Sequence, residues 1–165
     1  MSAKETFLKV WDREARTTSR VFKSFPPDQL DVKPHERSRS IRDLAWQCVG
    51  DERVIAAILA KPVNDLRNAP MAIPPPETMD EIVSAYEEAH RAAYEKLRQM
   101  SEEEFSRTTT AILRGGEWKT EQPETLWSNL MDEVHHRGQL TIYLRQAGGK
   151  VPSIYGPSAD EAAAL

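Results

Sequence analysis

A short stretch near the C-terminal end of the chain carries the side chains best suited to chemistry. Residues 131–145 (sequence MDEVHHRGQLTIYLR) hold two of the four histidines and place Asp132 four residues before His136. In a helix this spacing puts both side chains on one face, one turn apart, while His135 lies on another side. A carboxylate and an imidazole so arranged can share a metal ion or a proton, or form an ordinary surface pair.

A second polar pair, Gln47 and Asp51, lies in a segment that starts after Ser38 or Ser40, either of which can cap a helix. The segment carries apolar residues at helical spacing, and the pair falls just inside the edge of its apolar stripe. A buried amide or carboxylate without a partner is costly. Both groups therefore need polar neighbours from another element.

Metal ligands in a helix bundle come from facing helices, often as pairs of residues three or four positions apart. The two pairs together supply one imidazole nitrogen, two carboxylates and an amide oxygen. This donor set suits a divalent ion such as zinc, nickel, manganese or iron. The alternative is a surface pair without an ion, because Asp132 and His136 lie at the edge of the apolar arc of their own helix.

Four segments with apolar residues every three or four positions must hold these side chains in place. The sequence predicts an all-α fold, a four-helix bundle with a long crossover between the second and third helices. Residues 61–76, with the run Pro74-Pro75-Pro76, form the crossover as an extended linker. Residues 108–113, followed by Gly115-Gly116, fit a small hairpin. The four helices are expected at residues 3–25, 38–61, 77–100 and 123–147.

Length and composition indicate a single domain covering residues 1–165. The net charge of −4 argues against binding to nucleic acid driven by electrostatics. No apolar run reaches the length that crosses a bilayer, and the N-terminus does not resemble a signal peptide. The single cysteine, Cys48, excludes an intramolecular disulfide and a zinc site of several cysteines. We therefore expect a cytoplasmic protein with no nucleic-acid or membrane partner.

Other single residues have plainer interpretations. Cys48 falls on an apolar stripe and is expected to be a small core residue. Arg137 falls near the apolar arc, which predicts a buried acidic partner in the first or second helix. His90 falls on the polar side of the third helix and is expected to be solvated. Core or interface packing is also the expected role of the four tryptophans, Trp11, Trp46, Trp118 and Trp127.

Two regions of the chain resemble the DinB/YfiT-like proteins. Residues 135–140 (HHRGQL), 143–145 (YLR) and 150–158 (KVPSIYGPS) look like the closing signature of that family. Residues 34–46 (PHERSRSIRDLAW) look like its approach to the second helix. The resemblance covers essentially the whole chain. It implies the same four-helix bundle with a long crossover, assembled as a homodimer.

The resemblance also implies a site at which three histidines hold a divalent metal. The corresponding positions here are Gln47, Asp132 and His136, of which only the last is a histidine. Gln47 and Asp132 are both potential oxygen ligands, so the site has either changed its metal preference or lost the metal and kept a hydrogen-bonded cluster. Asp51 could add a ligand or orient one.

Some relatives of this kind are thiol-dependent transferases or isomerases, in which a metal lowers the pKa of a small-molecule thiol. The first expectation is therefore a metal-dependent transferase or hydrolase that acts on a small-molecule substrate, with Gln47, Asp132 and His136 as ligands. The alternative is a non-catalytic helical dimer, or a small-ligand-binding protein, whose ancestral metal site is degenerate. The sequence assigns no catalytic residue and does not identify the substrate.

Overall fold

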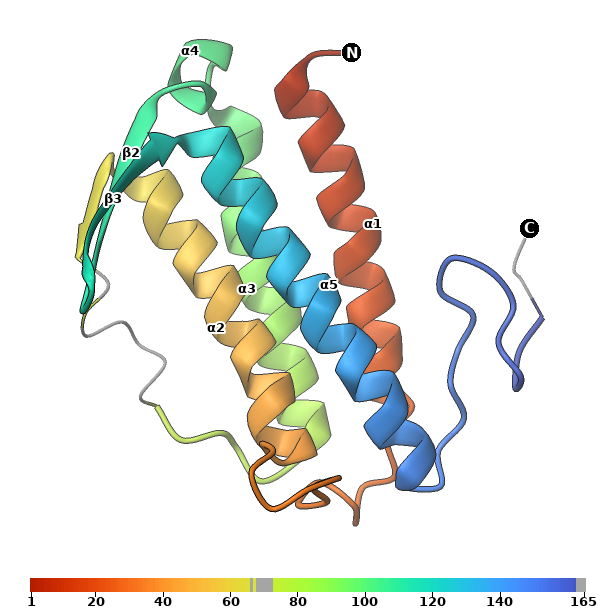
Figure 1. Cartoon of the computed structure of the whole chain (residues 1–165). Coiled ribbons are helices and arrows are strands. Elements are labelled where there is room, and N and C mark those ends of the chain that lie inside the picture. Colours follow the sequence, from red (N-terminus) through yellow and green to blue (C-terminus); the bar gives the residue numbers. More distant parts are fainter. Residues whose placement is uncertain (66, 68–72, 163–165) are drawn as a thin grey trace.

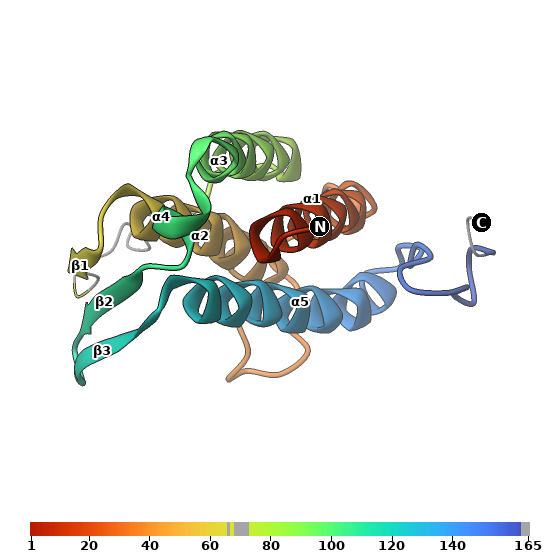
Figure 2. The same cartoon turned by 90° about the horizontal axis from the view of Figure 1, so that it is seen from above.

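The computed structural model describes residues 1–65, 67 and 73–162, and its main feature is a bundle of four long helices (Figure 1). Seen from above, α1 and α2 lie diagonally opposite each other, and each packs against both α3 and α5 (Figure 2). The predicted four-helix bundle with a long crossover between its second and third helices is confirmed. The long helices are α1 (Ala3–Lys23), α2 (Ile41–Ala60), α3 (Met79–Gln99) and α5 (Gln122–Gln146).

Local sequence sets where the helices begin and end. Three of the long helices and the short α4 (Glu102–Phe105) start with a capping box, in which a hydroxyl side chain and an acidic side chain three residues later bond each other's backbone N–H groups. α5 instead has Pro123 in its first turn. It ends before Gly148, whose φ of 79° favours glycine. The four capping residues are Ser2, Ser40, Thr78 and Ser101.

A small sheet lies beside the end of α2 and the start of α5 (Figure 1). The predicted hairpin is present as antiparallel strands β2 (Thr108–Leu113) and β3 (Gly116–Glu121). The third strand, β1 (Val63–Asp65), pairs in parallel with β2 and lies in the segment predicted to be an extended linker. The remainder of that linker at residues 66 and 68–72, and the last three residues of the chain, lie outside the described residues.

The core consists of two apolar clusters separated by a polar belt. One cluster lies toward the C-terminal ends of α1 and α5 and includes Phe22, Ile41 and Tyr86. The other lies toward the opposite end of the bundle and includes Phe7 and Ile55. The buried charged side chains occupy the intervening turns of α1, α2 and α5. The polar belt comprises Glu14, Thr18, Asp51, Glu52, Glu133 and Arg137.

The tryptophans divide between core and surface. Trp11 is fully buried, as expected of a core residue. Trp118 is 63% exposed because it lies on β3, most of whose residues face solvent, so it is not a core residue.

No helix in the described part of the chain is long and apolar enough to cross a membrane.

Candidate metal centre

Side chains from α2 and α5 converge at one edge of the polar belt, and we call Cys48, Asp51, Asp132 and His136 the α2–α5 cluster. His136 Nδ1 lies 3.6 Å from Asp51 Oδ2 and 3.8 Å from Asp132 Oδ2. These separations are too long for hydrogen bonds. Two ligands bound about 2.1 Å from a tetrahedral ion lie about 3.4 Å apart. The spacing therefore fits two ligands of one ion better than a direct contact.

Two atoms of the cluster are buried and lack a hydrogen-bond partner in the part of the chain that the structure describes. Neither Asp51 Oδ2 nor His136 Nδ1 has a hydrogen-bond partner among the described residues. Leaving such a group unsatisfied costs about 1–3 kcal/mol. A divalent cation between them would satisfy both atoms, so the donor set present here fits a metal. The pKa of His136 is raised, first because the Asp51 carboxylate lies beside its ring and further because of the Asp132 charge, although burial opposes the change.

Gln47 is joined to the cluster through Asp51. Its Nε2 donates a hydrogen bond to Asp51 Oδ1 at 2.9 Å, and its Oε1 accepts one from Arg39 Nη1 at 2.9 Å. The amide thereby fixes one oxygen of the Asp51 carboxylate and leaves the other facing His136. The amide oxygen predicted as a metal ligand is thus bonded to a guanidinium. Asp51, expected only as an additional or orienting group, lies nearer the centre of the cluster.

The two remaining predictions on α5 concern Asp132 and His135. The Asp132 side chain is 56% exposed while that of His136 is 14% exposed, so the pair spans the edge of the bundle as its helical spacing predicts. His135 is exposed, and its Nε2 lies 3.0 Å from the Gln139 amide nitrogen. His135 therefore takes no part in the cluster, as expected.

Cys48 is both a core residue and a neighbour of the cluster. It is fully buried, and its Sγ lies 3.7 Å from the carbonyl oxygen of Leu44. Its Sγ and one ligand atom each of Asp51 and His136 lie within 4.8 Å of one another. Burial, together with nearby carboxylates, raises the pKa of the thiol well above its ordinary value. This proximity was not predicted, although the i,i+3 spacing of Cys48 and Asp51 in the sequence indicates that the two side chains are neighbours on one helix.

Behind the cluster lie two fully buried carboxyl groups, Glu52 of α2 and Glu133 of α5. One oxygen of each, Oε2, has no hydrogen-bond partner in the described part of the chain. Burial raises the pKa of both groups to about 8, and the Asp51 charge adds to the effect. Both are therefore largely protonated at neutral pH. Glu52 Oε1 accepts a hydrogen bond from Trp11 and lies within hydrogen-bond distance of His90. Glu133 Oε1 accepts hydrogen bonds from Thr18 and Tyr86.

The prediction that His90 is solvated was wrong. Its side chain is only 12% exposed, and its Nδ1 lies 3.1 Å from Glu52 Oε1. The physical reason is that α1 packs over this face of α3, with the Trp11 and His90 rings 4.7 Å apart, edge to face. The side of α3 that the sequence predicts to face solvent thus makes a polar contact inside the bundle.

Replacing Glu133 with glutamine is expected to flatten the pH dependence of stability. The folded chain holds the Glu133 proton up to about pH 8, while an unfolded chain releases it near pH 4.5. The contribution of Glu133 to the free energy of unfolding is therefore full below pH 4.5 and is lost as pH rises toward 8. The loss is about 1.4 kcal/mol per pH unit for each proton. The Glu133→Gln variant lacks this loss.

Urea unfolding across this pH range measures the difference between the two profiles. Glu95→Gln is the matched control, since Glu95 is exposed and pairs with Arg98 on the surface of α3. A Glu133→Gln profile parallel to that of the unsubstituted chain would show that the buried carboxyl group does not retain its proton.

An ion pair next to His136 sets how α5 faces α2. Arg137 Nη2 lies 2.7 Å from Glu14 Oε2 of α1, with the two side chains 2% and 3% exposed. Arg137 Nη1 also donates to the Glu14 carbonyl oxygen at 3.0 Å. The predicted buried acidic partner of Arg137 is confirmed. Because this contact fixes the rotation of α5 against α1, it holds the adjacent His136 toward Asp51.

The four-helix bundle with its long crossover defines the class of helical protein to which this chain belongs, and it carries an acid–imidazole cluster between two facing helices. A model of the DinB family matches residues 1–164, and the chain belongs to that family. The chain is also similar to YrdA of Bacillus subtilis (strain 168), an uncharacterized protein. The two are 27% identical over 160 residues, which cover 94% of this chain and 89% of YrdA.

Solved structures share the fold at low sequence identity. A DinB-like protein from Bacillus cereus ATCC 10987 has a TM-score of 0.75 and 23% identity, covering 92% of this chain and 97% of the other. YfiT from Bacillus subtilis, described as a probable metal-dependent hydrolase, has a TM-score of 0.65 and 14% identity, covering 89% of each chain. A mycothiol-dependent maleylpyruvate isomerase has a TM-score of 0.60 and 15% identity, covering 85% of this chain and 61% of the isomerase. At these identities the likeness shows the fold alone.

Proposed function

We propose that this chain is a divalent-metal-dependent enzyme that acts on a small molecule, with the ion held by Asp51, Asp132 and His136. The observation that carries the proposal is the pair of buried atoms without partners, Asp51 Oδ2 and His136 Nδ1, 3.6 Å apart. Gln47 orients Asp51 through its amide. The descriptions of YfiT as a probable metal-dependent hydrolase and of the isomerase as mycothiol-dependent support hydrolysis or thiol-dependent transfer as the reaction class.

An ion bound at this position would polarise a carbonyl group and would lower the pKa of a bound thiol or water molecule. Zinc, nickel, manganese and iron(II) all accept imidazole and carboxylate ligands. Asp132, the exposed member, marks the side of the cluster that a substrate can approach from solvent. Burial raises the pKa of Glu52 and Glu133, which disfavours additional negative charge on the inner side of the cluster.

Elemental analysis of protein purified without a polyhistidine tag tests the proposal. After dialysis against each candidate metal, we expect a single ion per chain, lost in the Asp132→Ala/His136→Ala double variant. His135→Ala is the matched control, because it removes an exposed histidine of the same helix and leaves the cluster untouched. Binding by the unsubstituted chain that is no tighter than binding by the double variant would exclude a metal enzyme of this kind. A metal retained by the double variant would place the ion elsewhere.

A non-catalytic role is the second candidate, and the Arg39–Gln47–Asp51 chain of hydrogen bonds favours it. A guanidinium bonded to the Gln47 amide places positive charge near the position of the proposed cation. In this role Gln47 and Asp51 serve only as structural hydrogen-bond partners, and the same dialysis experiment would leave the protein free of metal. We also propose a homodimer, which the exposed Met131 and Ile142 side chains on α5 support and light scattering tests.

A further inference from the structure

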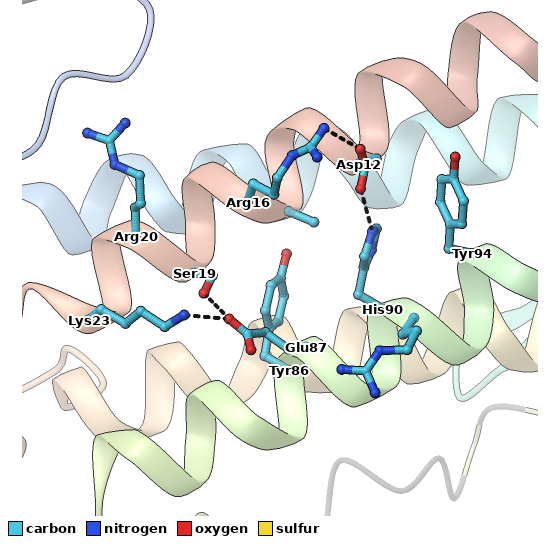
Figure 3. A pocket seen from close by; sticks show the side chains of 11 residues that line it. Asp12, Arg16, Ser19, Arg20, Lys23, Tyr86, Glu87, His90 and Tyr94 are labelled. Carbon is cyan, nitrogen blue, oxygen red and sulfur yellow. Dashed lines mark hydrogen bonds and ion pairs between the residues drawn. The ribbon is translucent and has the colours of Figure 1, made fainter. Parts of the chain in front are cut away.

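A cavity of about 520 Å³ opens between α1 and α3 (Figure 3). These two helices form the side of the bundle opposite α2 and α5 (Figure 2). Its floor is formed by the buried side chains of Ala15, Ser19 and Tyr86, and charged side chains from both helices surround it. Pockets for small molecules measure about 300–1,000 Å³ and combine an apolar lining with a few polar groups. We call this feature the α1–α3 cavity.

The charges around the α1–α3 cavity are mostly positive. The chain as a whole carries a net charge of −4, so a local excess of cations is not a general property of its surface. Two carboxylates, Asp12 and Glu87, face a larger number of cationic side chains. The cationic residues are Arg16, Arg20, Lys23 and Arg91.

These two carboxylates and Glu161, which lies 2.8 Å from Arg20 Nη2, neutralise most but not all of this charge. Lys23 Nζ lies 2.7 Å from Glu87 Oε1, an atom that also accepts a hydrogen bond from Ser19 at 2.6 Å (Figure 3). Arg16 pairs with Asp12, one turn before it on α1. Arg91 also lines the cavity and forms no direct ion pair with any other residue that the structure describes, although its charge helps to lower the pKa of Glu87. Its guanidinium is therefore the one least neutralised among the described residues that line this apolar floor.

The wall of the cavity also holds a polar atom without a partner. His90 Nε2 is buried and has no hydrogen-bond partner within the described residues. The nearest carboxylate oxygen, Asp12 Oδ1, lies 3.9 Å away, which is beyond hydrogen-bond distance (Figure 3). The half-buried Tyr94 ring lies beside it on the same helix and extends the aromatic lining. A bound molecule could therefore gain apolar and aromatic contact here.

We propose that the α1–α3 cavity binds a small organic anion, with its apolar body over Ala15 and Tyr86 and its carboxylate or phosphate group on Arg91 and Arg16. Guanidinium groups bind such oxyanions through two parallel hydrogen bonds, which gives direction as well as affinity. The buried floor excludes water from the body of the ligand. The site is separate from the α2–α5 cluster and does not require a metal, so it goes beyond the proposed function.

Titration of the full-length, metal-free protein with three probes, followed by amide NMR, tests this proposal. The probes are naphthoate, naphthyl phosphate and the neutral naphthalenemethanol, which share an aromatic body. We expect at least one of the anions to shift resonances along the facing turns of α1 and α3. The alcohol should bind at least about tenfold more weakly than that anion. The better of the two anions identifies carboxylate or phosphate as the natural group.

Arg91→Gln is expected to weaken binding of the anion by more than about fivefold. Arg98→Gln, on the same helix and paired with Glu95 outside the cavity, is expected to bind as the unsubstituted chain does. Both side chains are exposed, so neither change should disturb folding. Any one of three results would overturn the proposal: no binding of either anion, equal binding of the alcohol, or unchanged affinity in Arg91→Gln.

Discussion

Asp51→Asn is expected to weaken zinc binding by more than about 100-fold while leaving the fold intact. The change keeps the size of the side chain and its contact with Gln47, but it removes the negative charge and the free oxygen that faces His136. Loss of a group that merely orients a metal ligand costs about 10–100-fold in affinity, so loss of a ligand should cost at least as much. Isothermal titration of the protein without a tag measures the effect.

Cys48→Ala is the matched comparison for this experiment. The Cys48 thiol lies near enough to join Asp51 and His136 around one ion, but it is held in the neutral form by burial. We predict that Cys48→Ala keeps the zinc affinity of the unsubstituted chain. Wild-type affinity in Asp51→Asn would contradict the proposed ligand set, and so would a thiolate-to-metal absorption band in the cobalt-loaded protein.

Arg137→Met is expected to lower the free energy of unfolding by about 3–5 kcal/mol, because it leaves a buried carboxylate without its cation. Glu14 is 3% exposed, and its Oε2 accepts hydrogen bonds from Arg137 and from Tyr155, each at 2.7 Å. The exposed Arg13, 2.8 Å from the other oxygen, cannot replace the buried contact. Urea unfolding at neutral pH measures the loss.

Arg145→Met provides the surface control. Arg145 pairs with Asp160 at 2.7 Å, but its side chain is 51% exposed, and such pairs contribute about 0–1 kcal/mol. The double variant Glu14→Leu/Arg137→Met should regain much of the stability lost in Arg137→Met, because no uncompensated charge remains. If Arg137→Met were as stable as Arg145→Met, the buried pair would not hold α5 against α1.

The fold could be predicted because its signals are local. Capping serines, helix-breaking prolines and apolar spacing act within a few residues, so the long helices and the hairpin follow from the sequence. β1 could not be predicted in the same way. It has three residues, follows Pro62, and pairs with β2 more than forty residues later in the chain. Such a contact depends on how the bundle places the two segments.

The candidate site was only partly predictable, for a similar reason. Helical spacing pairs Asp132 with His136, and the family resemblance adds Gln47 to them. Neither shows that Arg39, in the preceding loop, bonds the Gln47 amide. The buried carboxyl groups were missed because glutamate is normally exposed. One signal was available: Glu133 lies one turn before Arg137, which the same spacing places near the core.

An anomalous diffraction map from crystals of the zinc-loaded protein, recorded at the zinc absorption edge, tests the central proposal most directly. We predict a peak between Asp51 Oδ2 and His136 Nδ1, about 2.0–2.2 Å from each, with Asp132 completing the protein ligands. A map with no peak at this position, with Asp51 and His136 joined by a direct hydrogen bond, would contradict a metal centre between α2 and α5.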